Sequence, residues 1–359
     1  PTGFLKLNTF NLPDSTIEKG SDYFNPVLYT GNDTTLSVTG VGFEPSWTWI
    51  KCRSHGGSAS FEHILTDTVR GANKTLNSDN SNTEAANNAT GYLSVFDSDG
   101  FTVTGGDATN GIGRTYVAWN WKANGSGSSN TDGSVTSTVS ANTTAGFSIV
   151  SFTAPSGTGN FTAGHGLGVT PAMVIVKTRD SGSAPWYVWN KNFSNLTDDY
   201  VRLNATSAKQ TQSSGWGAGM TSSVIGLRAG YTTVATEDHI AYCFAEIEGY
   251  SSFGSYTGNG SSDGPFVYTG FRPAFVITKR TNAASGWPMH DDKRSPYNVT
   301  EATLYANAAD AEVNPSTEDI DFLSNGFKMR GTTTARNSSG STYIYMAFAE
   351  NPFKNANAR

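Results

Sequence analysis

The sequence contains few charged residues and no cluster of basic ones. Only 15% of its 359 residues are Asp, Glu, Lys or Arg, and the formal net charge is −6 at pH 7. A protein that neutralises a nucleic-acid backbone needs a basic patch, and no stretch of this chain supplies one. We therefore do not expect nucleic acid to be a partner.

Long apolar runs, disulfide spacing and metal-ligand motifs are also missing. No stretch approaches the roughly 18 apolar residues of a membrane-spanning helix, so we expect no membrane insertion. Cys52 and Cys243 fall at different places in the chain and are expected to be buried free thiols. The five histidines form no closely spaced pair, and acidic pairs such as Asp198-Asp199 lack the spacing of a calcium loop. We expect no metal, no other cofactor and no catalytic residues.

Glycine, small polar residues and aromatic residues are abundant instead. The chain has 39 Gly, and 12% of its residues are aromatic. Gly, Ser, Asn and Thr suit turns and aromatic side chains suit pleated surfaces, so the composition favours short strands joined by many turns. We predict an all-β protein with little helix, and the best helix candidates are residues 80–89 and 301–311.

A three-fold internal repeat organises the chain. Pro45, Pro171 and Pro273 each precede an apolar run, and each run reaches a lysine six residues after the proline, at Lys51, Lys177 and Lys279. Proline cannot donate to a strand ladder, so it is expected just before a strand. A nearly continuous apolar run predicts a central strand that is covered on both faces.

Further anchors recur around these prolines in one order. Each copy has an opening strand, a turn into a strand, and an aromatic-rich closing strand whose alternation indicates one buried face. The opening strands are 28–32, 151–154 and 255–259. The turns are 98–103 and 324–329, and the second copy keeps only part of this motif at 223–226. The closing strands are 116–121, 239–244 and 343–348.

These anchors predict three tandem β-sandwich domains, jelly-roll-like and about 100 residues long, each with its own core. A Gly/Ser/Asn/Thr-rich linker should let the first copy hinge, while the second and third copies should hold a fixed orientation. The predicted segments are a lead-in (1–26), repeat 1 (27–125), the linker (126–146), repeat 2 (147–254), repeat 3 (255–353) and a C-terminal tail (354–359).

Tryptophans outside the anchors are the candidate binding residues. Trp186, Trp189, Trp216 and Trp287 lie in stretches rich in Ser, Asn and Gly. Aromatic faces stack on the C–H faces of sugars while amides and hydroxyls bind the sugar hydroxyl groups, so this mixture suits carbohydrate recognition. The alternative interpretation is core or subunit packing, because large aromatic side chains are mostly buried.

The sequence resembles the C-terminal repeat region of large virion proteins of tailed bacteriophages, especially marine and cyanophage-type ones. Nearly the whole chain is covered by the resemblance. Its carriers are the strings at 241–245, 249–260, 263–273, 321–328 and 343–350. The resemblance implies a tail fibre, spike or decoration protein on the virion surface, with other virion proteins and host surface polysaccharide as partners. It also implies a homo-oligomer, with a trimer as one form, and it carries over no catalytic residues.

Three functions remain open at this point. The first is a surface protein that binds host glycan or another virion protein through its loops. The second is a purely structural capsid-decoration or filament-forming subunit. The third, a glycan depolymerase, needs two carboxylates about 5 to 10 Å apart in a groove.

Overall fold

The computed structural model describes residues 14–54 and 60–356, and it is almost entirely β-structure. This confirms the all-β expectation. Helical turns in these residues are the short 3-10 segments η2 (Gly20–Asp22), η3 (Ser316–Glu318) and η4 (Phe353–Asn355). Residues 80–89 and 301–311, the predicted helix candidates, are extended or turn structure instead. Backbone amides in these segments donate hydrogen bonds to residues distant in sequence; Glu84 N, for example, donates to Arg179 O at 2.7 Å. These tertiary hydrogen bonds override a weak helical preference.

Each of three successive segments folds into a main sheet and a smaller second sheet. In repeat 1 the main sheet has the order β1-β9-β3-β4 and the second sheet the order β2-β8-β7. Its strands are β1 (Phe24–Thr30), β2 (Leu36–Thr39), β3 (Trp47–Cys52), β4 (Ile64–Asp67), β5 (Lys74–Thr75), β6 (Ala85–Ala86), β7 (Leu93–Asp97), β8 (Gly100–Val103) and β9 (Thr115–Trp121).

Repeat 2 keeps this order and extends the main sheet at both edges. The main sheet runs β10-β11-β12-β19-β14-β15-β16-β17, and the second sheet is the pair β13-β18. The strands are β10 (Ser128–Asn130), β11 (Ser137–Asn142), β12 (Phe147–Thr153), β13 (Gly159–Gly164), β14 (Met173–Thr178), β15 (Tyr187–Asn190), β16 (Asp199–Arg202), β17 (Gln210–Thr211), β18 (Val224–Ala229) and β19 (Asp238–Phe244).

Repeat 3 has a main sheet of order β20-β27-β22-β23-β24 and a second sheet of order β21-β26-β25. The strands are β20 (Ser251–Thr257), β21 (Phe266–Tyr268), β22 (Phe271–Arg280), β23 (Pro288–Asp291), β24 (Leu304–Tyr305), β25 (Ile320–Leu323), β26 (Gly326–Met329) and β27 (Thr342–Pro352).

The anchor prolines occupy equivalent places in the three sheets. Two residues after each proline, the central strand pairs with an aromatic residue of the closing strand. These pairs are Trp47 with Trp121, Met173 with Phe244, and Phe275 with Phe348. The opening strands β1, β12 and β20 flank the closing strands on the other side, so the repeat seen in the sequence is a repeat of topology and register.

The predicted linker is part of a sheet. Strands β10 and β11 lie within residues 126–146, and β11 pairs with β12 along its whole length, from Ser137 opposite Phe152 to Asn142 opposite Phe147. The Gly- and Ser-rich composition correctly indicated turns. The short runs between these turns form strands because the edge of β12 is free to pair with them.

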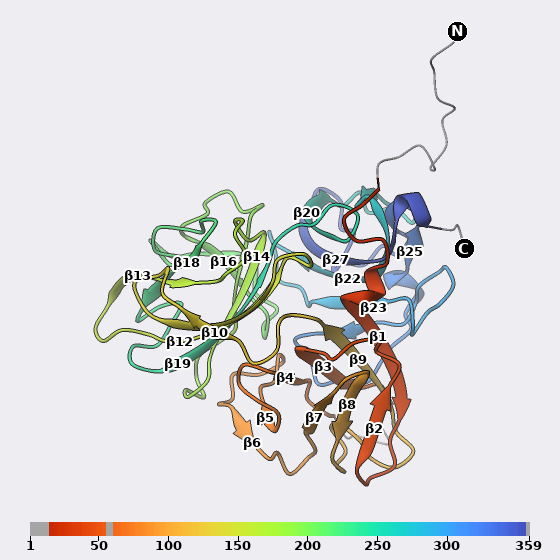
Figure 1. The fold of residues 1–359 in the computed structure, drawn as a ribbon. Coiled ribbons are helices and arrows are strands. Elements are labelled where there is room, and N and C mark those ends of the chain that lie inside the picture. Colours follow the sequence, from red (N-terminus) through yellow and green to blue (C-terminus); the bar gives the residue numbers. More distant parts are fainter. Residues whose placement is uncertain (1–13, 55–59, 357–359) are drawn as a thin grey trace, which may run out of the picture.

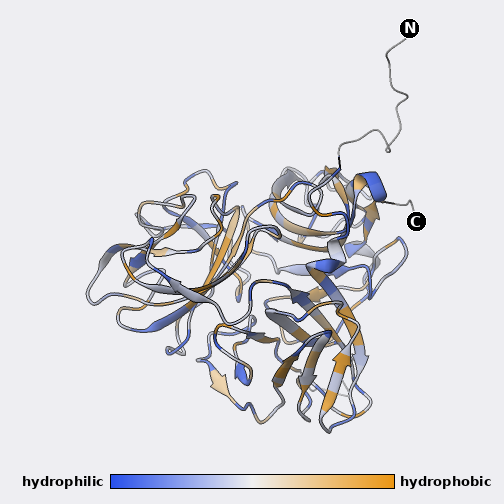
Figure 2. Ribbon diagram, in the orientation of Figure 1, coloured by the Kyte–Doolittle hydropathy of each residue, from blue (hydrophilic) through white to orange (hydrophobic). Residues whose placement is uncertain are grey.

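Each main sheet has one face toward its own second sheet and one face toward the other two repeats. Along β3, Ile50 and Cys52 belong to the inner core of repeat 1, whereas Trp47 and Trp49 belong to a core shared by all three repeats. Repeats 1 and 2 therefore have inner cores of their own, as expected, but the expectation that the three repeats pack separately, with a hinged first copy, is wrong. Figure 1 shows the three lobes gathered around a common centre, and Figure 2 shows apolar strands there and polar loops at the periphery.

Aromatic rings from different repeats interlock in the shared core. Trp47 of repeat 1 stacks on Tyr242 of repeat 2 with ring centroids 4.2 Å apart, and Phe24 stacks on Phe348 of repeat 3 at 5.0 Å. Phe244 and Phe348 join repeats 2 and 3 at 6.0 Å. Aromatic pairs of this kind add about 0.5–1.5 kcal/mol each beyond the area that they bury.

The anchor lysines close the three repeats into a ring. Each lies on the centre-facing side of its strand, is fully buried, and donates to a carbonyl of a neighbouring repeat. Lys51 donates to Ala309 O of repeat 3 at 2.8 Å, Lys177 to Ser81 O of repeat 1 at 3.3 Å, and Lys279 to Thr206 O of repeat 2 at 3.0 Å. The three contacts run in one direction around the ring, from repeat 1 to 3, from 3 to 2, and from 2 to 1.

Charge networks reinforce two of the three interfaces. Arg179 and Glu84 pair at 2.9 Å between repeats 2 and 1, and Arg53 and Glu312 pair at 2.8 Å between repeats 1 and 3. Behind each glutamate lies a buried arginine–aspartate pair, Arg70–Asp67 or Arg294–Asp291. The aspartate then accepts a hydrogen bond from the next repeat, from the hydroxyl of Tyr242 or the indole nitrogen of Trp119.

At the third interface, between repeats 2 and 3, other residues occupy all of these positions. Asn190 stands where the other repeats have the aspartate, and Phe193 stands three residues later in place of the arginine. Lys209, whose amide donates to Thr281 O at 2.8 Å, takes the place of the glutamate and lies 6.0 Å from the Phe193 ring. A buried charge is tolerated only with its partner, which is why the members of the network change as a set.

Candidate functional site at the junction of repeats 2 and 3

The four candidate tryptophans are interior residues. Each is at most 2% exposed, and each indole N–H donates to a backbone carbonyl. Trp186 donates to Asn77 O of repeat 1 at 2.8 Å, and Trp287 donates to Arg202 O of repeat 2 at 2.9 Å. These two residues therefore hold neighbouring repeats together and present no ring face for a sugar.

The other two tryptophans stabilise repeat 2. Trp216 donates to Asp199 O at 2.9 Å and Trp189 to Leu196 O at 2.7 Å, and both belong to the inner core of that repeat. Trp189 also forms part of the wall of a cavity. The alternative interpretation, core packing, is therefore the right one for these side chains. Their Ser- and Gly-rich neighbours form the turns before and after the buried strands.

A first cavity of about 730 Å³ opens on repeat 2 beside the anchor proline. Its wall combines the Gly168–Pro171 turn, Trp189 and the turn that contains Met220 with the start of the segment that joins repeats 2 and 3. Val169 and Leu196 are exposed apolar side chains of this wall. The cavity is mainly apolar, with Lys191 and Glu246 as its charged groups.

A second cavity of about 890 Å³ lies between repeats 2 and 3. The joining segment 245–250, the end of β21 and the C-terminal turn η4 all contribute to it. Its wall is more polar than that of the first cavity and contains hydroxyl, amide, carboxylate and ammonium groups. The lining includes Asp14, Ser15, Lys191, Asn192, Glu246, Glu248, Ser252, Tyr268, Thr269, Tyr345, Phe353 and Lys354.

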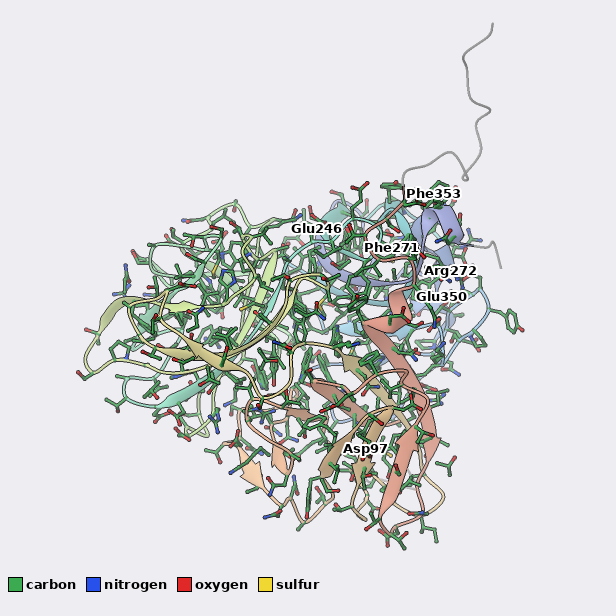
Figure 3. All side chains as sticks on the ribbon, viewed as in Figure 1. Asp97, Glu246, Phe271, Arg272, Glu350 and Phe353 are labelled. Carbon is green, nitrogen blue, oxygen red and sulfur yellow. The ribbon has the colours of Figure 1, made fainter. Side chains whose placement is uncertain are left out.

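The ion pair of Lys191 with Glu246 lies on the border between the two cavities, since both residues line both cavities. Glu246 also accepts from Ser252 Oγ and from Phe253 N, each at 3.3 Å, so its carboxylate is fixed from three sides. Figure 3 shows Glu246 between the lobes of repeats 2 and 3, with Phe271 and Phe353 on the repeat 3 side. The two cavities are therefore neighbours that share these two wall residues, and together we call them the junction groove.

The groups in the groove suit binding. Burial raises the pKa of Tyr345, whose hydroxyl lies 3.1 Å from Ser252 Oγ, so this phenol stays protonated at neutral pH. The other acidic groupings of the sequence are dispersed: Asp291 belongs to the repeat 3–repeat 1 network, and Asp199 pairs with Lys209. Within the part of the chain that the structure describes, no three His, Cys, Asp or Glu side chains gather as a metal site.

Two features of the structure were not predicted from the sequence: the contacts of the anchor lysines and the junction groove. Lys51, Lys177 and Lys279 marked the repeat in the sequence, and their common spacing was the signal that a shared contact required them. The groove had no comparable signal, because its residues come from many separate stretches of the chain, from Asp14 to Lys354. Among the described residues, no helix has the length and apolar character needed to cross a membrane.

Comparison with known proteins gives one match. A family described as a domain of unknown function (DUF7483) matches residues 19–352, so that a single family domain covers all three repeats. No curated protein and no solved structure matches the chain. A single domain over this whole span agrees with the shared core.

Proposed function

We propose that this chain, which belongs to the DUF7483 family, is a non-enzymatic attachment module of a bacteriophage virion surface protein, of tail-fibre or spike type. The observation that carries this proposal is the closed ring of three sandwiches. Equivalent buried contacts between all three pairs of repeats make one rigid body, and rigid scaffolds with variable loops are well suited to presenting binding sites.

The two ends of the described chain lie close together. Lys354 pairs with Asp14 at 2.5 Å, so the first and last described residues lie together on the repeat 3 side of the ring. The lead-in also packs on the last strand, since a Cβ at Gly20 would lie 1.9 Å from Ala349 O. Both ends of the described chain therefore lie on the repeat 3 side of the ring, beside the polar cavity that Asp14 and Lys354 line.

We propose other virion proteins and host surface polysaccharide as partners, and the virion surface as the location. Electron microscopy of virions labelled with an antibody against the folded chain tests this proposal. We expect labels on the outside of intact particles, at tail or capsid-attached appendages. Labelling only of disrupted particles, or none, would overturn it.

The non-enzymatic part of the proposal has its own test. Host polysaccharide incubated with the chain should yield no new reducing ends. Release of oligosaccharides would instead assign a depolymerase activity, and the carboxylates of the junction groove would be its first candidates.

Self-association is a further part of the proposal. Light scattering measures whether the chain forms homotrimers or whether the three repeats within one chain already supply the threefold contact. A trimer is the form that we propose for the attached fibre.

A further inference from the structure

Strand β21 of repeat 3 exposes two aromatic side chains. Phe266 is 45% exposed and Tyr268 is 62% exposed, whereas Val267 between them is buried. Successive side chains of a strand point to opposite faces, so the two rings lie on the same outer face of β21. Exposed rings in such an arrangement form a surface on which a planar apolar face can stack.

The equivalent strands of the other repeats show that folding does not require these rings. A buried residue pairs with the residue after the strand's glycine in all three second sheets: Val38 with Phe101, Phe161 with Leu227, and Val267 with Phe327. The outward neighbours of that buried residue are Ser37 and Thr39 in repeat 1, Asn160 and Thr162 in repeat 2, and Phe266 and Tyr268 in repeat 3. Only repeat 3 carries aromatic side chains at these two positions.

Tyr268 also lines the polar end of the junction groove. Glu248 and Asn192 lie in the same wall, and the side chain of Glu248 has no hydrogen bond or ion pair to any other described residue. A carboxylate that accepts hydrogen bonds from two hydroxyl groups, in the same cavity as an aromatic face, matches the two kinds of surface on a sugar ring.

We infer that the polar end of the junction groove binds a saccharide of the bacterial surface, with Tyr268 and Phe266 stacking on the sugar faces and Glu248 accepting from its hydroxyl groups. This inference rests on the proposed attachment function. It assigns the binding to residues other than the buried tryptophans.

A second copy of the chain is the competing occupant, because β21 is an edge strand of its sheet. The lining of the groove favours the saccharide. The cavity that Tyr268 lines also contains carboxylates and ammonium groups, whereas the centre of a protein–protein interface is depleted of charged residues.

The test uses the whole chain and an array of purified bacterial O-antigen and capsular polysaccharides, with periodate-oxidised duplicates in which the sugar diols are destroyed. Binding constants for the best-bound polysaccharide are then measured for Tyr268→Ala, Phe266→Ala and Glu248→Gln. Tyr297→Ala is the matched control, since Tyr297 is 73% exposed in the same repeat and does not line the groove.

We expect binding that periodate abolishes, a loss of about tenfold or more for Tyr268→Ala, and an unchanged affinity for Tyr297→Ala. An unfolding transition like that of the unmodified chain shows that each variant is folded. Equal binding by Tyr268→Ala, or no binding to any polysaccharide, overturns the inference. A dimer that Tyr268→Ala converts to a monomer also overturns it, in favour of a contact between copies.

The two proposals fail separately. Labelled virions without polysaccharide binding leave the attachment function standing and remove only the saccharide site. Unlabelled virions remove the attachment function whatever the array shows.

Discussion

The three anchor lysines occupy the same position in each sequence repeat and make the same kind of contact between repeats in the structure. Each donates its ammonium protons to backbone carbonyls in a buried place between two repeats. Desolvation lowers the pKa of Lys51, Lys177 and Lys279 to about 8 in each case. The three lysines share one kind of buried environment and the same lowered pKa, as expected if they have equivalent structural roles.

A pH dependence follows from these lowered pKa values. Below about pH 8 the lysine is charged in both states, and burial of the charge opposes folding. Between pH 8 and the unfolded value of 10.5 the unfolded chain binds more protons, so stability rises with pH. The free energy of unfolding of the unmodified chain, minus that of Lys177→Met, should therefore rise by about 2 kcal/mol between pH 7 and pH 10.

Urea unfolding of both chains at several pH values measures this difference. Using the difference between the two chains removes the contributions of buried tyrosines and cysteines, which are the same in both. Parallel curves for the two chains would contradict a lowered pKa at Lys177.

At the scale of elements, the charge network between repeats 3 and 1 is a set of mutually dependent residues. Asp291 accepts from Trp119 Nε1 at 3.0 Å and pairs with Arg294 at 2.5 Å, and both charged side chains are fully buried. Repeat 2 shows that the same fold accepts Asn190 and Phe193 at these two positions.

We therefore expect Asp291→Asn alone to cost about 3–5 kcal/mol of unfolding free energy, because Arg294 loses its buried partner. The double variant Asp291→Asn with Arg294→Phe, which copies repeat 2, should cost less than the single variant. A double-mutant cycle by urea unfolding measures the coupling. A double variant less stable than Asp291→Asn would show that the pair is needed at this interface for another reason.

The pairing of β21 with β26 depends on a glycine for a steric reason. A Cβ at Gly326 would lie 2.1 Å from Val267 O, so β21 can pair with β26 only because this position has no side chain. Gly100 has the same place in β8, with a Cβ 1.9 Å from Val38 O and a φ of +154°.

Gly326→Ala should cost about 2–4 kcal/mol and should speed amide exchange at Val267, because β21 must move away from β26. Gly159→Ala in repeat 2 is the control, since a Cβ there meets open space. Hydrogen exchange and urea unfolding of both variants check the expectation, and equal stability of the two would refute the steric explanation.

At the scale of the whole molecule, the shared core makes the three repeats one cooperative unit. Trp47 of repeat 1 contacts Tyr242, Phe147 and Phe244 of repeat 2, with ring centroids 4.2 to 6.1 Å apart. Removal of one such side chain leaves a cavity that two repeats share.

Trp47→Ala should therefore cost about 3–5 kcal/mol, and calorimetry should show one unfolding transition at a lower temperature. Amide exchange should increase in repeats 2 and 3 as well as in repeat 1. Separate transitions, with repeats 2 and 3 unaffected, would restore the interpretation of three independent domains.

The sequence alone determined the triplication and the opening, central and closing strands of each repeat. Continuous apolar runs correctly predicted central strands buried on both faces, and Gly and Pro indicated turns, so residues such as Pro45 and Gly326 could be placed correctly. The closing strands, whose alternation predicted one buried face, are buried on both faces. Because periodicity records only that a face is buried, only the tertiary structure decided what covers it. The partner of Trp47, the carbonyls that hold Trp186 and Trp287, and the strands within the apparent linker all depend on chain that is distant in sequence, and so does the groove at Tyr268.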